Sequence, residues 1–161
     1  MTASASDVID VLRRRGWMLG VAESLTGGAL TSALVSVAGA SAVVAGGVVA
    51  YATPLKHTLL GVDQVLLDRE GPVHPDVAIR MAEGVRRAVR VNGSDAEVGV
   101  STTGIAGPDS PDGQPVGTVH IAVATPERTR TQAFLFAGDR AQIRAATVDA
   151  ALAMLVETAR E

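Results

Sequence analysis

The chain has 161 residues, a net charge of −3 and no cysteine. This length fits a single domain over residues 1–161 with one hydrophobic core. The negative charge provides no field that would attract nucleic acid, and an aromatic content of 2% is too low for a base-stacking platform. The absence of cysteine excludes disulfides, thiolate metal sites and a cysteine nucleophile.

The N-terminal segment and the apolar runs bear on localisation. Asp7 and Asp10 interrupt the apolar residues of the N-terminus, which is not the pattern of a signal peptide. The longest apolar stretch, residues 42–51, contains two glycines and is too short to cross a bilayer. We therefore expect a soluble, cytoplasmic protein that does not bind membranes.

The first half of the chain alternates helical and strand patterns. Ser6 is a candidate cap for a helix over residues 7–15, which Gly16 would end. A strand over 17–22, a turn over 23–28 and a helix over 28–37 follow. The Val-rich segment 43–51 reads as a central strand, in which Gly46 and Gly47 permit close approach. Pro54 then begins a short helix that Gly61 ends, and a second short helix spans 63–69.

The second half begins with a clear amphipathic helix. It runs from Pro75 to about residue 91, and we expect these apolar residues to point inward: Val77, Met81, Val85, Ala88 and Val89. A strand over 96–102 leads into a Gly- and Pro-rich loop over 103–115. Strands over 117–124 and 129–136 form a hairpin, and Asp139 caps a last helix to about residue 159. These elements predict an α/β fold, a three-layer α/β/α sandwich with a central mixed sheet.

Three loops that each follow a predicted strand carry the residues best suited to chemistry. They are residues 23–28, 51–56 and 102–107. Because ligands bind at strand ends in such folds, we expect the loops to meet at one edge of the sheet. The first contains Ser24, Thr26, Gly27 and Gly28 at a strand-to-helix junction. It reads either as a helix cap or as a nucleophile beside free N–H groups that stabilise an anion.

A serine nucleophile needs a base, and Lys56 is the better candidate. It is the single lysine among 14 basic residues, which reads either as codon bias or as a requirement for a side chain that can deprotonate. As a base its pKa must fall from about 10.4 to about 7–8. Burial and a nearby cation such as Arg140 could lower it. His57 is the one plausible histidine base, whereas His74 and His120 read as surface or satisfied core residues.

The loop that begins at Thr102 and Thr103 reads as a turn or as an anion site. Its hydroxyls and the backbone around Gly104 could bind an anion. The loop lacks the ending of a Walker A motif, which argues against nucleoside triphosphate chemistry. The carboxylates of Asp109, Asp112 and Asp139 are scattered, so neither a metal nor another cofactor is indicated.

Four ordered segments resemble the CinA C-terminal domain family, which includes the stand-alone nicotinamide mononucleotide deamidases. They are VAESLTGGAL (21–30), GGVVAYATPLKHTLLGV (46–62), STTGIAGPDSPDGQPVGTVHIAVA (101–124) and FAGDRAQIRAATVDAAL (136–152). The resemblance implies a metal-free amidohydrolase that converts this nucleotide to nicotinic acid mononucleotide and ammonia, in pyridine-nucleotide salvage.

The resemblance also implies roles for single residues. It places the catalytic pair on Ser24 and Lys56. It implies a substrate-binding role for these residues: Tyr51, Thr26, Gly27, Gly28, Thr102, Thr103, Gly104 and Arg140. Ala52 and Thr53 stand where relatives often carry Ser-Asn, which leaves the Tyr51–Lys56 spacing intact. Gln114 replaces a lysine of many relatives, which argues against a phosphate-binding role there.

The sequence is also compatible with two other functions. A non-catalytic nucleotide-binding or interaction module could keep the same fold, and a Ser–His esterase could use His57. Small domains of this family commonly pair, so the resemblance implies a homodimer with a small-molecule nucleotide as substrate.

Overall fold

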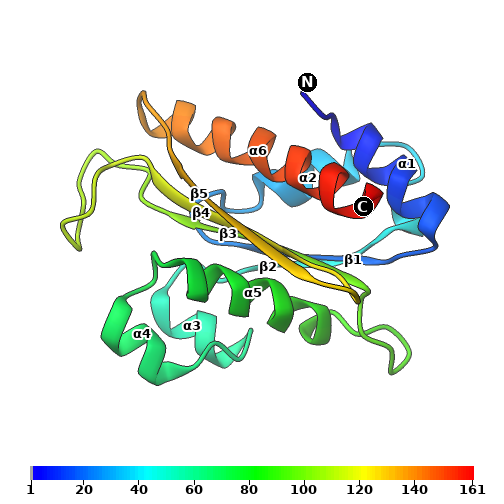
Figure 1. Ribbon diagram of the computed structural model, residues 1–161, viewed down its shortest axis with the longest axis horizontal. Helices are drawn as coiled ribbons and strands as arrows, with labels where there is room; N and C mark the ends of the chain where they lie inside the picture. Colours follow the sequence, from blue (N-terminus) through cyan, green and yellow to red (C-terminus); the bar gives the residue numbers. More distant parts are fainter. Residues whose placement is uncertain (1) are drawn as a thin grey trace.

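The computed structural model describes residues 2–161 and places a five-stranded sheet between two helical layers (Figure 1). Helices α1 (Ala5–Arg15), α2 (Ala29–Val35) and α6 (Arg140–Arg160) cover one face of the sheet. Helices α3 (Thr53–Thr58), α4 (Gln64–Glu70) and α5 (Pro75–Ala88) lie on the other. The predicted three-layer α/β/α class is confirmed.

The strands follow the order β2-β1-β3-β4-β5 and form a mixed sheet, as predicted. Their bounds are β1 (Leu19–Glu23), β2 (Val44–Val49), β3 (Val98–Gly104), β4 (Thr118–Ala124) and β5 (Thr129–Leu135), and a 3-10 helix, η1 (Ala40–Ala42), precedes β2. Strands β2, β1 and β3 are parallel, whereas β4 and β5 pair antiparallel. Strand β4 runs opposite to both of its neighbours, β3 and β5. The carboxyl ends of the other four strands therefore lie at the same edge of the sheet: β1, β2, β3 and β5.

The Val-rich strand β2 is an edge strand, so its prediction as a central strand was wrong. It pairs with β1 alone. Its apolar character comes from the helices that cover both faces: a Cβ on Gly46 would lie 3.2 Å from Val89, and one on Gly47 would lie 2.5 Å from Thr31. An edge strand covered on two faces needs the same residues as a central strand, so composition does not separate the two.

Helix boundaries also differ from the predictions: α2 ends at Val35 rather than at residue 37, and two further helices differ as follows. The first helix starts at Ala5, because Ser4 rather than Ser6 caps it in a reciprocal box with Asp7. Helix α5 ends at Ala88, which is exposed rather than inward, while Val89 is half-buried. The caps at Gly16 and Asp139 and the hairpin around residues 126–127 are as predicted.

The core lies mainly between the sheet and the layer of α1, α2 and α6. Strand residues such as Val21, Val100 and Ile121 pack there against Leu12 and Leu155. A second cluster on the opposite face joins α5 to α4 and the end of β2. The sheet is thus fixed from both sides, which holds its strand ends in place.

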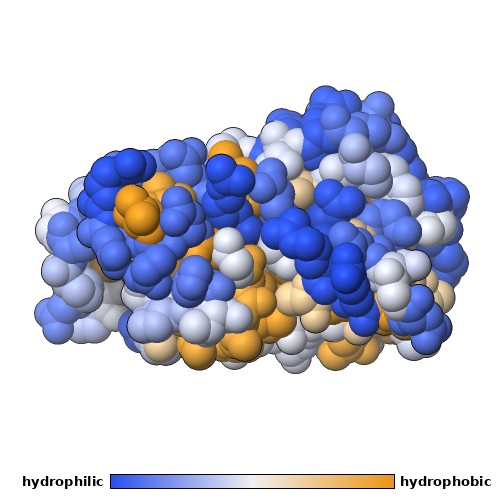
Figure 2. All heavy atoms as spheres, turned by 90° about the horizontal axis from the view of Figure 1, so that it is seen from below, coloured by the Kyte–Doolittle hydropathy of each residue, from blue (hydrophilic) through white to orange (hydrophobic). Residues whose placement is uncertain are grey.

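The surface carries scattered apolar side chains. Figure 2 views the layer of α3, α4 and α5 from outside and shows hydrophobic patches within a largely hydrophilic face. Val49, Leu59 and Val65 are among the exposed large hydrophobic residues. No helix among residues 2–161 is long and apolar enough to span a membrane.

Candidate active site

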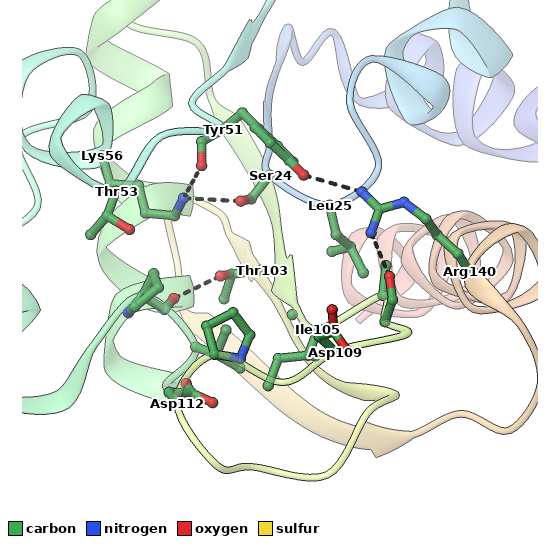
Figure 3. Close-up of a pocket in the computed structure, with 16 residues that line it drawn as sticks. Ser24, Leu25, Tyr51, Thr53, Lys56, Thr103, Ile105, Asp109, Asp112 and Arg140 are labelled. Atoms are coloured by element: carbon green, nitrogen blue, oxygen red, sulfur yellow. Dashed lines mark hydrogen bonds between the residues drawn. The ribbon is translucent and has the colours of Figure 1, made fainter.

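A cavity of about 380 Å³ opens where the parallel strands end, and three loops meet on its wall. Ser24 follows β1, Tyr51 and Lys56 follow β2, and Thr103 is the second-last residue of β3. Arg140 begins α6 at the same edge (Figure 3). The other lining residues are Leu25, Thr53, Pro72, Val73, Gly104, Ile105, Ala106, Gly107, Asp109, Pro111 and Asp112. This volume is within the range of small-molecule sites.

Lys56 and Ser24 are in direct contact at the floor of this cavity. The Nζ atom of Lys56 lies 2.9 Å from the Oγ atom of Ser24. Lys56 is the largest of the fully buried side chains, with 1% of its surface exposed, and Ser24 keeps 8%. A lysine buried without a carboxylate partner is rare in folded proteins, because desolvation of an ammonium group is costly.

Burial lowers the pKa of Lys56 from 10.5 to about 8. The cause is desolvation of the charged form, and no cation contributes. The suggestion that Arg140 helps to lower this pKa was therefore wrong: its guanidinium donates to Gly107 and Tyr51 instead. At pH 7 about a tenth of the molecules would carry a neutral amine at this position.

The contacts of Nζ fit both protonation states, because an ammonium group can donate to all three oxygens, those of Ala50, Tyr51 and Ser24. Nζ donates to the carbonyl oxygens of Ala50 at 2.7 Å and Tyr51 at 3.4 Å. A neutral amine has two N–H bonds and one lone pair, so two carbonyls leave the lone pair for the third neighbour, the hydroxyl of Ser24. In this state the Ser24 hydroxyl donates to Nζ, which is the arrangement of a nucleophile and its base.

The loop that carries Ser24 is fixed by buried hydrogen bonds. The Ser24 N–H donates to the Thr102 carbonyl at 3.1 Å. The hydroxyls of Thr26 and Thr102 share a hydrogen bond of 2.8 Å, and both residues are fully buried. Glu23, also fully buried, accepts from the backbone N–H groups of Leu30 and Thr31 at 2.9 Å each.

Four of the predicted binding residues lie behind the cavity rather than on its wall. They are Thr26, Gly27, Gly28 and Thr102. The hydroxyls of Thr26 and Thr102 are bound to each other, and the Gly27 N–H donates to the Ser24 carbonyl at 3.1 Å. These residues shape the loop around Ser24, and direct contact with a ligand is not supported for them.

Arg140 and Tyr51 stand together at the mouth of the cavity. The guanidinium donates to the Tyr51 hydroxyl at 3.1 Å and to the Gly107 carbonyl at 2.7 Å. Figure 3 shows the guanidinium beside the Tyr51 hydroxyl, across the cavity from Lys56. Two of its five N–H bonds are used, so three are free to bind an anion. Besides Lys56, Arg140 is the one cationic side chain on the described wall.

The third loop contributes backbone and one hydroxyl. Thr103 and Gly104 line the cavity, and the Thr103 hydroxyl donates to the Pro72 carbonyl at 2.7 Å, so it is free only to accept. A Cβ on Gly104 would lie 2.7 Å from the Thr118 carbonyl, which requires glycine here. Gln114 donates to the Val73 carbonyl at 3.0 Å and holds the loop against the α4–α5 connection.

The three histidines lie outside the cavity wall. His57 is exposed, lies off the cavity wall and binds the Val62 carbonyl through Nδ1, while the Ser24 hydroxyl contacts Lys56, so the Ser–His alternative was wrong. His74 caps α5 by accepting from the Asp76 N–H. His120 was expected to be exposed or satisfied, but its buried Nδ1 has no partner among residues 2–161. Burial, with His74 nearby, lowers the pKa of His120.

Several residues of the site were not predicted from the sequence. Pro72 and Val73 reach the wall from the α4–α5 connection, and Asp109 and Asp112 lie at its rim. Arg144 donates to two carbonyls of the Ser24 loop. Its position four residues after Arg140, on the same helix face, was the available signal.

The fold and the site together define an α/β protein with a preformed serine–lysine pair at the carboxyl edge of its parallel strands. Residues 1–159 match the CinA C-terminal domain family. The chain belongs to the CinA C-terminal domain family.

Relatives and solved structures agree with this assignment. A CinA-like protein of Frankia casuarinae is 46% identical over 145 residues, which cover 90% of this chain and 32% of the relative. A putative competence-damage inducible protein of Limosilactobacillus reuteri is 48% identical over 78% of this chain and 29% of the relative. The chain thus spans about a third of the length of these curated relatives.

Two crystal structures share the fold over nearly all of both chains. A CinA superfamily protein of Klebsiella pneumoniae superposes with a TM-score of 0.90 at 32% identity, covering 97% of this chain and 95% of the other. The competence/damage inducible protein CihA of Agrobacterium tumefaciens gives 0.84 at 34% identity, with 100% of both chains covered.

Proposed function

We propose that this chain is an amidohydrolase that removes ammonia from nicotinamide mononucleotide and yields nicotinic acid mononucleotide, within pyridine-nucleotide salvage in the cytoplasm. The observation that carries the proposal is the buried contact of 2.9 Å between Lys56 Nζ and Ser24 Oγ, with the pKa of Lys56 lowered to about 8. The choice of substrate rests on the family resemblance, and the cavity is consistent with it.

The Ser24–Lys56 pair supports acyl transfer. Ser24 Oγ attacks the carboxamide carbon while its proton passes to Lys56 Nζ. The resulting ammonium group donates this proton to the departing nitrogen, so that ammonia leaves and an ester to Ser24 forms. Water then attacks the ester with Lys56 again as base, which releases the carboxylate and restores the Ser24 hydroxyl.

The substrate's own chemistry assists this attack. A pyridinium ring withdraws electrons from the attached carboxamide, so its carbonyl carbon is more electrophilic than that of an ordinary amide. Arg140 is the free cation of the cavity wall and would hold the 5′-phosphate through its unused N–H bonds. The phosphate would then lie at the mouth and the amide at the floor, against Ser24.

Release of ammonia from nicotinamide mononucleotide by the purified chain tests the proposal. We expect turnover by the wild type, and at least a 1,000-fold loss in Ser24→Ala and Lys56→Met. His57→Ala is the matched control, because His57 neighbours Lys56 but lies outside the cavity wall, and it should retain activity. Nucleotide binding without turnover would favour the non-catalytic module instead. The homodimer stays a prediction that gel filtration tests.

A further inference from the structure

Asp109 is an unpaired carboxylate on the cavity wall. Its side chain forms no hydrogen bond or ion pair with any atom of residues 2–161, and the residue is exposed. The other carboxylate of the wall, Asp112, is already bound: it accepts from the Gln114 backbone N–H at 3.2 Å and from the Gln114 side-chain amide at 2.9 Å. Among the described wall residues, Asp109 is therefore the one carboxylate that is free to accept hydrogen bonds from a ligand.

Arg140 holds the loop that carries Asp109. Its guanidinium donates to the Gly107 carbonyl at 2.7 Å, two residues before Asp109 in the chain. In Figure 3 Asp109 lies between Arg140 and Asp112, across the cavity from Lys56. Although Asp109 and Arg140 share one wall, they form no ion pair with each other. A free cation and a free carboxylate on one wall suit a ligand that carries an anion and hydroxyl donors at separate positions.

A mononucleotide carries these groups in a fixed arrangement. Its ribose is joined to the base at C1′ and to the phosphate through C5′, while the 2′- and 3′-hydroxyls project from the opposite edge of the sugar ring. In the proposed function the amide lies at Ser24 and the phosphate at Arg140, so the ribose spans the space between them. Its two hydroxyls then need an acceptor near the arginine but separate from it, and the carboxylate of Asp109 is such an acceptor.

We propose that Asp109 binds the 2′,3′-diol of the ribose and makes the cavity selective for ribonucleotides. The two carboxylate oxygens accept from two adjacent hydroxyls, and acidic residues bind ribose hydroxyls in the same way in dinucleotide-binding folds. The pyridinium ring nitrogen has no N–H bond, so it attracts a carboxylate only through space, whereas the diol supplies two donors. The inference rests on the proposed function for the orientation of the nucleotide, but it does not require turnover.

The test compares Asp109→Ala and Asp109→Asn with the control Asp149→Ala in the full chain. Asp149 is an exposed aspartate on α6 that lies off the cavity wall. The ligands are nicotinamide mononucleotide and its 2′,3′-dideoxy analogue, which lacks the diol but keeps the pyridinium and the phosphate. Calorimetry gives Kd for both ligands in a Ser24→Ala background, where no turnover interferes. Ammonia release gives kcat and KM in chains that keep Ser24.

We expect the Ser24→Ala chain to bind the mononucleotide about 10- to 100-fold more tightly than the dideoxy analogue. Asp109→Ala should abolish this preference, with the affinity for the dideoxy analogue changed less than threefold. In chains that keep Ser24, the loss should appear mainly as a raised KM for the mononucleotide. Asp109→Asn should keep part of the preference, because its amide oxygen still accepts, and Asp149→Ala should keep all of it.

A preference for the diol that survives Asp109→Ala overturns the inference. An equal loss of affinity for both ligands also overturns it, because it indicates an effect of charge or of loop geometry instead. Equal affinity for the two ligands before Asp109 is changed has the same consequence. A preference that is lost with Asp109, in a chain that releases no ammonia, supports the inference and overturns the proposed deamidation. A chain that binds neither ligand overturns both.

Discussion

The amine of Lys56 lies 2.9 Å from the hydroxyl of Ser24, although 32 residues separate them in the chain. The contact forms because β1 and β2 are parallel neighbours, so the loops that follow them leave the sheet side by side. The Ala50 N–H donates to the Glu23 carbonyl at 2.9 Å and extends this pairing to the residue before Ser24. Helix α3 then turns Lys56 back towards Ser24.

The pH dependence of the rate follows from the lowered pKa of Lys56. Only the neutral amine accepts the Ser24 proton, so kcat/KM should rise about tenfold per pH unit below pH 8 and level off above it. Steady-state kinetics between pH 6 and 9.5 measure this profile. Lys56→Arg should be inactive throughout, because a guanidinium does not deprotonate. A rate that is flat across pH 6–8 would contradict the assignment of Lys56 as base.

Removal of the buried amine should stabilise the fold at neutral pH. The folded-state pKa of Lys56 is lowered from 10.5 to about 8, which corresponds to roughly 3 kcal/mol against folding below pH 8. Lys56→Met removes this penalty but also the hydrogen bonds to Ala50 and Tyr51. We expect a net gain of about 1 kcal/mol, or roughly 2–4 °C in melting temperature at pH 7.

The same variant has a pH signature that packing changes cannot imitate. Above pH 10.5 Lys56 is neutral in the folded and the unfolded wild type, so its burial does not lower the free energy of unfolding. As the pH falls from 10.5 through 8, the unfolded chain binds the proton more readily and the free energy of unfolding falls, whereas Lys56→Met lacks this dependence. Thermal melts of both proteins at pH 7 and pH 10 test this. The advantage of the variant should shrink at pH 10, and a constant difference between the two melting temperatures would count against the burial argument.

Arg140 should discriminate between substrates with and without a phosphate. In Arg140→Met, kcat/KM for nicotinamide mononucleotide should fall about 10- to 100-fold, because a charge-assisted hydrogen bond contributes roughly 1.5–3 kcal/mol. The value for nicotinamide riboside, which lacks the phosphate, should change less than threefold. Tyr51→Phe, which removes one contact of Arg140, should show a smaller loss of the same kind. Equal losses for both substrates would assign Arg140 another role.

Glu23 should contribute strongly to stability, because its buried carboxylate accepts three hydrogen bonds. Two come from the backbone of Leu30 and Thr31, and one comes from the Thr31 hydroxyl at 2.6 Å. In Glu23→Gln one carboxylate oxygen becomes an NH₂ group, which cannot accept hydrogen bonds from Leu30 or Thr31. The free energy of unfolding in urea should therefore fall by roughly 2–4 kcal/mol. Thr31→Val removes one bond and should cost about 1 kcal/mol. A loss below about 0.5 kcal/mol in Glu23→Gln would show that the carboxylate is dispensable.

The elements that local chemistry controls were predictable from the sequence. Gly16 ends α1 with a positive φ of 67°, and Asp139 caps α6 through a hydrogen bond to the Gln142 N–H, as their positions in the sequence indicated. The edge position of β2 was not predictable, because helices on both faces give an edge strand the composition of a central one. Ser4 and Ser6 are equally good caps by type, and the Asp7 side chain decides between them.

The site was predictable to a similar degree. A single lysine among arginines, together with the family resemblance, indicated Lys56, and strand order placed it beside Ser24. The pairing of Thr26 with Thr102 and the reach of Arg144 to the Ser24 loop depend on tertiary contacts across 76 and more than 100 residues. No local pattern encodes the contact between Thr26 and Thr102. The spacing of Arg144 from Arg140 indicates a shared helix face, but it does not indicate which carbonyls Arg144 binds, so these contacts could be assigned only from the structure.

The most direct test is the titration of Lys56 itself, and the sequence makes it unambiguous. Because Lys56 is the one lysine of the chain, protein labelled with ¹³C at the lysine Cε gives a single side-chain signal. Its chemical shift between pH 6 and 12 reports the ionisation of this amine in the folded protein. We expect a midpoint near pH 8. A midpoint at the ordinary value of about 10.4 would leave no neutral amine at pH 7 and would contradict the proposed role of Lys56 as the base for Ser24.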